Sequence, residues 1–332
     1  MTKISLTLAS GDYDRVRPLW DGSVTAEGLD LNVVLLPPEE IFFRMARYQD
    51  FDAAEMSMSS YLISKQRRTP RFVAVPAFPS RKFRHGDIYI RSDSRIKKPE
   101  DLRGGRIGVP EYQMTAFVWV RGILEDFYGV AATGVHWFSG GTEKPGREER
   151  LRIVLPPSFQ LTAIPNDTTL FDLLRRGEID AVFTARVPSP FVRGEDWMVR
   201  LFPKYKEVEK EYYRQSGIFP IMHTVVLREE VYERYPWAAQ SLYKAYLQAK
   251  DLCFERHLNA PALPVSLPWF GEAMEETLGM MGRDFWPYGL ELNRKTLEKM
   301  LEYMCKQGLL PEDYQPCLED LFAPNTLKTF GV

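Results

Sequence analysis

The polar segment that contains Glu111, Tyr112, Gln113 and Thr115 has the residue types of a small anion-binding loop. It follows a short branched run, 106–109, that predicts a buried strand, and it precedes apolar residues at helical spacing in 115–128. Unpaired amide groups and the positive end of the helix dipole would face this loop. The loop is therefore a candidate seat for a carboxylate or phosphate. The alternative is an ordinary strand-to-helix connection with Thr115 as the cap.

Histidine is the side chain that titrates nearest to neutral pH, which makes it a natural group for proton transfer. The chain has 4 His, and none of them is spaced as HxH, HxxxH or HExxH. The sequence therefore predicts no metal site built from a histidine cluster. A GxSxG nucleophile elbow and a GxxxxGK phosphate loop are also absent from the sequence.

Two parts of the chain show the same order of helix and strand. Upstream, a helix leads into a short strand that Ser57 and Ser59 follow. Downstream, a helix that begins near Thr169 and ends at Gly177 leads into a strand over 179–183. This repetition predicts two similarly built α/β lobes.

Composition sets limits on the class of protein. With 332 residues, of which 45% are hydrophobic, the chain can form two domains with a core each. Its net charge of -2 argues against a general attraction to nucleic acid or to a membrane surface, and no apolar run approaches the roughly 20 residues that span a bilayer. Ile4, Leu6 and Leu8 alternate with polar residues, which predicts a first strand rather than a signal peptide, and hence a cytoplasmic protein. The three Cys include no CxxC pair, as expected of reduced thiols.

Five segments together carry a resemblance to a known family. They are YDRVRPLWDG at 13–22, FRHGDIYI at 83–90, KKPEDLRGGRIGVPEYQMTA at 97–116, GEIDAVFTAR at 177–186 and FPIMHTVVLREEVYERYPW at 219–237. Over nearly its whole length the sequence resembles the 4,5-dihydroxyphthalate decarboxylase family.

The resemblance implies an α/β, two-lobed, type II periplasmic-binding-protein-like fold with a cleft between the lobes. Residues 1–90 and 220–332 would form lobe I, and residues 91–219 would form lobe II. The last part of lobe I is expected to be a helical C-terminal tail that packs on that lobe, because helical patterns follow Pro236 and recur near 269–280 and 294–307.

The resemblance also implies non-oxidative loss of one carboxyl group from 4,5-dihydroxyphthalate, giving protocatechuate and carbon dioxide. Direct departure of carbon dioxide would leave a very basic aryl carbanion. A workable route instead protonates the carboxyl-bearing ring carbon while the para hydroxyl pushes electron density into the ring, and this route needs no cofactor. The site then requires cations for two carboxylates, an acid near the ring carbon and a group that takes the phenolic proton.

Arginine suits the carboxylates, because its planar fork can donate two parallel hydrogen bonds. In the implied fold, Arg15, Arg84 and Arg186 should face the cleft, although Arg15 has the alternative of pairing with Asp12 or Asp14.

Two histidines inside the matched segments, His85 and His223, are the candidates for proton transfer, with Glu111 as an alternative acid or base. For each histidine the alternative is a hydrogen-bonded structural role. The polar side chains expected to contact the substrate are Ser57, Ser59, Tyr112, Gln113 and Thr115, each of which could instead serve in capping or loop hydrogen bonds.

Two other functions fit the same features. One is a non-catalytic binding protein for a small acid that shares the fold, and the other is a decarboxylase of a related hydroxybenzoate or phthalate. The expected partner is a small aromatic dicarboxylate, with no nucleic acid, membrane or metal, and a homodimer is possible because enzymes commonly pair.

Overall fold

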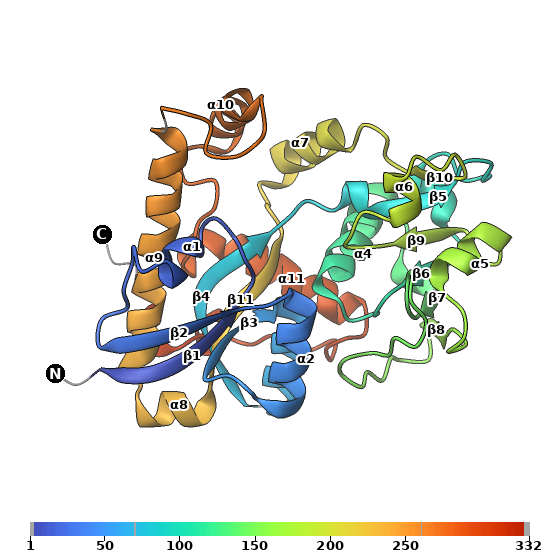
Figure 1. Cartoon of the computed structure of the whole chain (residues 1–332). Coiled ribbons are helices and arrows are strands. Elements are labelled where there is room, and N and C mark those ends of the chain that lie inside the picture. The colour runs from blue at the N-terminus through green and yellow to red at the C-terminus, as the bar shows by residue number, and fades with distance from the viewer. Residues whose placement is uncertain (1–2, 70, 260, 329–332) are drawn as a thin grey trace.

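The computed structural model of the chain describes residues 3–69, 71–259 and 261–328. They form two sheets that lie side by side, each with helices packed against it (Figure 1). The chain builds four strands of the first sheet, crosses to form the whole second sheet, and returns to add β11 and the C-terminal helices. The predicted two-sheet α/β architecture with C-terminal helices is confirmed.

The first sheet has five strands in the order β2-β1-β3-β11-β4. β1 is parallel to β2 and β3, whereas β11 runs antiparallel between β3 and β4. The alternating residues at the N-terminus form β1, with Leu6 and Leu8 buried, as predicted. The strands are β1 (Ile4–Ser10), β2 (Leu29–Leu35), β3 (Ala53–Ser57), β4 (Phe72–Arg81) and β11 (Ile221–Arg228).

The second sheet has six strands in the order β10-β5-β9-β6-β7-β8. β5, placed by the sequence at the end of the 1–90 segment, pairs with β9 and β10 in this sheet, so the crossing falls between β4 and β5. The lobe boundaries themselves remain a prediction. The strands are β5 (Ile88–Arg91), β6 (Arg106–Val109), β7 (His136–Ser139), β8 (Gln160–Ala163), β9 (Ala181–Phe183) and β10 (Met198–Arg200).

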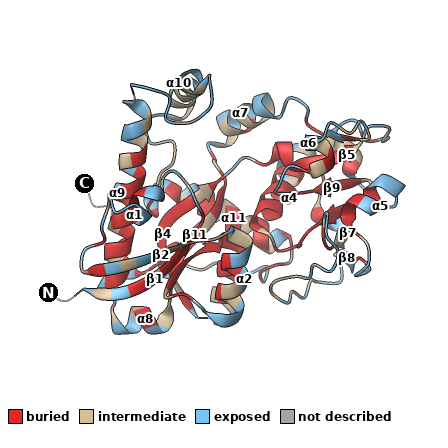
Figure 2. Cartoon of the chain, viewed as in Figure 1, coloured by how far each residue is buried: buried red, intermediate tan, exposed pale blue. Residues whose placement is uncertain are grey.

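Helices α4 and α9 contribute long buried faces to the core, as the colouring of Figure 2 shows. Gly129 ends α4 in the left-handed conformation with φ +63°, which confirms the predicted stop. No helix within the described residues has both the length and the apolar character that crossing a membrane requires. The helices are α1 (Arg17–Trp20), α2 (Pro38–Tyr48), α3 (Met58–Arg67), α4 (Thr115–Tyr128), α5 (Leu170–Arg176), α6 (Ser189–Val192), α7 (Tyr205–Ser216), α8 (Glu229–Arg234), α9 (Trp237–Leu258), α10 (Phe270–Met281) and α11 (Arg294–Lys306).

The C-terminal helices do not all pack on the first sheet. α9 contacts β4 and α1, as expected, but α11 packs against α4, which follows the second sheet's β6. Tyr303 of α11 meets the Trp119 ring with centroids 5.6 Å apart, and its hydroxyl donates to Asp126 at 2.8 Å. Gly122 leaves room for the Tyr303 ring, because a Cβ there would overlap it. The expectation that the tail packs on lobe I remains a prediction, and the structure adds that α11 packs against α4, which itself contacts both α3 and β11.

Candidate active site

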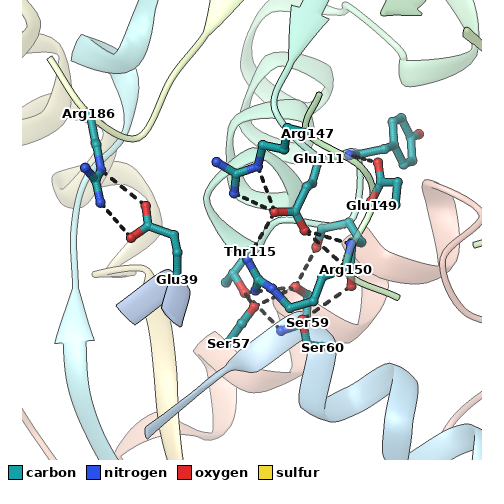
Figure 3. A network of polar contacts seen from close by, with 12 residues as sticks. Glu39, Ser57, Ser59, Ser60, Glu111, Thr115, Arg147, Glu149, Arg150 and Arg186 are labelled. Atoms are coloured by element: carbon teal, nitrogen blue, oxygen red, sulfur yellow. Dashed lines mark hydrogen bonds and ion pairs between the residues drawn. The ribbon is translucent and has the colours of Figure 1, made fainter. Parts of the chain in front are cut away.

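Glu111 is the centre of a buried network of charges in the loop between β6 and α4 (Figure 3). Its Oε1 accepts hydrogen bonds from Nη2 of Arg147 at 2.5 Å and from Nη2 of Arg150 at 3.0 Å. Its Oε2 accepts from the Arg150 amide at 3.2 Å. The loop predicted to bind an anion thus presents its own carboxylate to two arginines. Glu111 holds these arginines in place and is not a free acid or base.

Hydroxyl groups join the starts of α3 and α4. Thr115 Oγ1 lies 2.8 Å from Ser57 Oγ and accepts the Ser59 amide at 3.0 Å, while Ser59 Oγ donates to the Gln113 carbonyl at 2.6 Å. All four residues are buried. Thr115 therefore supports the first turn of α3, and the prediction that it caps its own helix is wrong, because Met114 is the N-cap of α4 and makes no side-chain cap bond. In the structure, the hydroxyl groups of Ser57, Ser59 and Thr115 therefore make the loop hydrogen bonds that were the alternative to substrate contact.

Tyr112 and Glu149 extend this network into the core. Tyr112 is fully buried, with the Arg121 guanidinium 3.9 Å above its ring, and its hydroxyl donates to the Gln307 carbonyl at 3.2 Å. The Glu149 carboxylate accepts the Tyr112 amide. Burial raises the pKa of Glu149 to about 7, and the nearby charge of Glu111 adds to the rise. Tyr112 is thus committed to core packing.

A second network lies on the first sheet, where β3 carries Glu55 and β11 carries His223. Glu55 Oε1 lies 2.5 Å from His223 Nδ1 and accepts from the Tyr13 hydroxyl at 3.0 Å, and Oε2 accepts the Gly11 amide at 2.9 Å. Glu55 is completely buried.

The electrostatics of this pair fix the role of each imidazole nitrogen. Burial alone would raise the pKa of Glu55, but the charge and hydrogen bond of His223 outweigh it, so the pKa lies below its ordinary value. An ionised Glu55 needs a proton on His223 Nδ1, which then donates to the carboxylate. Nε2 has no hydrogen-bond partner within the described part of the chain, and the side chain is 15% exposed. His223 is therefore oriented to exchange a proton at Nε2.

The two networks are neighbours. The register of β3 and β11 places His223 opposite Ser57. The Phe42 ring on α2 meets the His223 imidazole edge-on with centroids 4.7 Å apart. The Arg150 guanidinium lies 5.3 Å from the centroid of the Phe42 ring. An imidazole, an aromatic face and a cation therefore lie in one region between the two sheets.

A cavity of about 680 Å³ lies between α2 and the loops that follow β6, β7 and β9, and Arg147, which pairs with Glu111, is part of its lining. Arg186 reaches across it and forms a two-pronged ion pair with Glu39, with Nη2–Oε2 at 2.8 Å and Nε–Oε1 at 3.2 Å. Three basic side chains, including Arg147 and Lys144, line the cavity against two acidic ones. Its volume suits a small ring compound, and its charge suits an acid.

Two larger cavities, each of about 760 Å³, lie beside the C-terminal helices. Four glutamates face two basic side chains in the cavity beside α11, and three acidic residues face two basic ones in the cavity between α9 and α10. A dicarboxylate would be repelled by either set, so the smaller cavity between the sheets is the better candidate.

Arg15 lies at the edge of the second network. Its guanidinium stacks on Tyr13 and Trp286, with centroid distances of 4.5 and 4.2 Å. It also donates to the Pro79 carbonyl at 2.6 Å and to Asp14 Oδ1 at 2.9 Å. The alternative pairing with Asp14 is therefore present in the structure, and Arg15 reaches the second network through its contact with Tyr13.

Arg84 and His85 are not brought together with the other predicted residues. Arg84 is buried in an ion pair with Asp87 at 2.7 Å, and its Nε contacts Met222 Sδ at 3.3 Å. Met222 precedes His223 on β11, so the two side chains point to opposite faces of the sheet. His85 is 4% exposed, and burial lowers its pKa to about 4, which leaves a neutral imidazole packed in the core.

Several residues of these networks were absent from the sequence predictions, among them Glu55, Arg147 and Arg150. The signal for Glu55 was a lone acidic residue in an apolar strand, because such a group stays buried only with partners. Arg147 and Arg150 lie in an irregular loop without periodicity, and no pattern in the sequence points to them.

Comparison with known proteins first defines the class. The structure is similar to the periplasmic aliphatic sulphonate binding protein SsuA from Escherichia coli, with a TM-score of 0.52, 13% identity, and coverage of 98% of this chain and 99% of that chain. The periplasmic sulfonate-binding protein SsuA from Methylobacillus flagellatus gives a TM-score of 0.51 at 12% identity, over 97% of this chain and 92% of that one. The fold is therefore periplasmic-binding-protein-like, and this likeness establishes the fold alone.

Sequence similarity then gives the family. The chain is 41% identical over 332 residues, 100% of both chains, to a 4,5-dihydroxyphthalate decarboxylase of Comamonas testosteroni. It is 45% identical over 214 residues to an enzyme of the same name from Pseudomonas putida, covering 64% of this chain and 83% of that one. No family model matches the sequence. The chain belongs to the 4,5-dihydroxyphthalate decarboxylase family, and it is a carboxy-lyase.

Proposed function

We propose that the protein converts 4,5-dihydroxyphthalate to protocatechuate and carbon dioxide in the region between the two sheets. The observation that carries this proposal is the Glu55–His223 pair, with 2.5 Å between Oε1 and Nδ1, together with a cavity that Lys144, Arg147 and Arg186 line. The named activity of the two relatives supports the choice of substrate.

His223 is the proton donor in this proposal. Its Nε2 delivers a proton to the ring carbon that bears the leaving carboxylate, while electron density from the para oxygen, ionised at that stage, forms a ring ketone. The bond to the carboxylate carbon then breaks, carbon dioxide leaves, and its bonding electrons restore the aromatic ring and the phenolate. The balance is one proton consumed and one carbon dioxide released.

Glu55 positions the donor. Its carboxylate fixes the Nδ1–H tautomer and stabilises the imidazolium before the proton is transferred. The Tyr13 hydroxyl and Gly11 amide hold that carboxylate from the other side, so the imidazole has one orientation. In this proposal His223 alone takes the proton-transfer role for which the sequence offered His85, His223 and Glu111, and Glu55 is added as the residue that orients it.

The arginines bind the two carboxylates of the substrate. Arg147 and Arg186 line the cavity, and Arg150 faces Phe42 beside His223. Glu39 and Glu111 neutralise these cations in the present structure, so a substrate carboxylate has to compete with them. Closure over the ring would exclude water and strengthen each of these charge interactions.

The test follows both products from 4,5-dihydroxyphthalate in deuterated water. We expect equal amounts of protocatechuate and carbon dioxide, with one deuterium at the ring position that lost its carboxylate. His223→Asn should lower kcat by about 10²–10⁴, the usual contribution of a general acid, with a small change in KM. Phthalate, which lacks the hydroxyls, should bind and compete without being decarboxylated.

Controls separate the roles. His136→Asn alters a histidine of β7, hydrogen-bonded to Thr162 at 2.9 Å, and should leave kcat unchanged. Glu55→Gln should shift the pH profile of kcat as well as lower it, because it removes the charge that stabilises the imidazolium. Normal kcat in folded His223→Asn would refute the assignment of the acid. Turnover of another aromatic acid only would refute the substrate.

A further inference from the structure

Asp14, Cys253 and His257 form a compact group of metal-ligating side chains outside the proposed reaction centre. Their ligand atoms all lie within 4.8 Å of one another. Asp14 belongs to the loop after β1, whereas Cys253 and His257 lie on α9, so the fold joins residues almost 240 positions apart.

The spacing of the two residues on α9 suits chelation. Residues four apart on a helix share one face, and Cys253 Sγ lies 3.9 Å from each ring nitrogen of His257. His257 Nε2 lies 3.8 Å from Asp14 Oδ2. Tetrahedral zinc, with bonds of about 2.0–2.3 Å, separates such ligand atoms by about 3.3–3.6 Å. Small side-chain movements therefore complete the geometry.

The donor atoms interact mainly with one another. Asp14 uses Oδ1 for the Arg15 amide and guanidinium, at 2.7 and 2.9 Å, and leaves Oδ2 directed at His257. Within the described residues, the ring nitrogens of His257 have these thiol and carboxylate groups as their polar neighbours, both beyond short hydrogen-bond distance. The Phe270 ring meets the imidazole edge-on at 5.3 Å and orients it. Cys253 is buried and not in a disulfide.

We propose that Asp14, Cys253 and His257 bind a divalent ion of the zinc class. A thiolate, an imidazole and a carboxylate select zinc or cobalt over magnesium or calcium, which prefer oxygen ligands. Binding releases the thiol proton, so the thiolate and the carboxylate together neutralise the two positive charges of the ion. The charges of Arg15 and Arg256, which also act on Cys253, favour the thiolate. A water molecule completes the tetrahedron from the side of Asp14, which is 44% exposed.

The ion has a structural consequence for the neighbouring site. It fastens the loop after β1 to α9, and that loop carries Tyr13, which holds Glu55. A search for histidine pairs misses this site because its spacing is CxxxH and its third ligand is remote in sequence. The ion takes no part in the proposed reaction.

Cobalt(II) is the probe for the test, added to the metal-free protein with zinc as competitor. We expect one cobalt per chain, a thiolate-to-cobalt charge-transfer band, and loss of that band when zinc is added. Cys253→Ser should abolish the band, and His257→Gln should weaken zinc binding by about 100-fold or more. Cys317→Ser, which alters an exposed thiol, should change neither.

The outcomes are separable from those of the decarboxylase assay, because metal binding is read without substrate. A charge-transfer band that survives in Cys253→Ser, or zinc affinity unchanged in His257→Gln and Asp14→Asn, would overturn the proposal. Absence of stoichiometric cobalt binding to the folded protein would overturn it as well. Asp14 and His257 lie nearer to solvent than Cys253, so their variants test the site even if Cys253→Ser does not fold.

Discussion

Glu149→Gln should stabilise the protein, and more so as the pH rises. Glu149 is half-buried and turns its carboxyl inward, where Oε1 accepts the Tyr112 amide and Oε2 is buried without a partner among the residues described. Burial raises its pKa from 4.5 to about 7. Glutamine has the same shape, keeps an acceptor for the Tyr112 amide, and carries no charge to desolvate.

The sign follows from proton binding. Below the ordinary pKa of 4.5, the folded and unfolded chains both hold the proton, so the ionisation of this carboxyl does not change stability there. Between 4.5 and about 7 the unfolded chain releases it while the folded chain keeps it, so the free energy of unfolding falls as pH rises. At about 1.4 kcal/mol per pH unit, the full cost approaches about 3 kcal/mol above neutral pH.

Urea unfolding of wild type and variant at about pH 5 and about pH 8 measures this cost. The difference in unfolding free energy should widen by about 2 to 3 kcal/mol in favour of Glu149→Gln between these conditions. Glu148→Gln, a change at the exposed neighbouring residue, should give no such widening. A constant difference across the pH range, or destabilisation at the higher pH, would refute the assignment of Glu149 as a buried carboxyl with a raised pKa.

Two further changes test the cavity and the packing of the C-terminal tail. Glu39→Gln releases Arg186 from a largely exposed ion pair worth at most about 1 kcal/mol, so we expect KM for the dicarboxylate to fall by up to about fivefold. A raised KM would show that Glu39 helps to bind substrate. Gly122→Ala places a Cβ against the Tyr303 ring and should lower the free energy of unfolding by about 1–3 kcal/mol. Gly279→Ala, at an exposed position of α10 where a Cβ meets nothing, should raise it by up to about 1 kcal/mol. Equal effects of the two glycine changes would contradict the described packing.

The secondary structure was largely predictable because it depends on local patterns. The strand at 106–109 and the helix ended by Gly129 follow from apolar spacing and from the left-handed conformation that glycine accepts. The placement of α11 was not predictable in this way. Its apolar face requires a partner, but the sequence of that face does not say which sheet provides the partner.

The polar networks were harder to predict, since each depends on residues that are distant in sequence. His223 was identified, but its partner Glu55 is 168 positions away and is recognisable only when β3 and β11 are known to pair. Glu111 was identified as a polar loop residue. Its ion pairs with Arg147 and Arg150 depend on the path of an irregular loop, and no pattern in the sequence predicts that path.

The position of β11 has a consequence for biosynthesis. This strand lies between β3 and β4, yet the ribosome makes it after the whole six-stranded sheet. Until residue 228 has emerged, β3 and β4 lack the neighbour that separates them, and each presents an unpaired edge to other nascent chains or chaperones. The same late strand brings His223 to Glu55, so a chain interrupted before β11 lacks both the strand that joins β3 to β4 and the proposed acid. Catalytic activity would therefore report that synthesis and folding of the first sheet are complete.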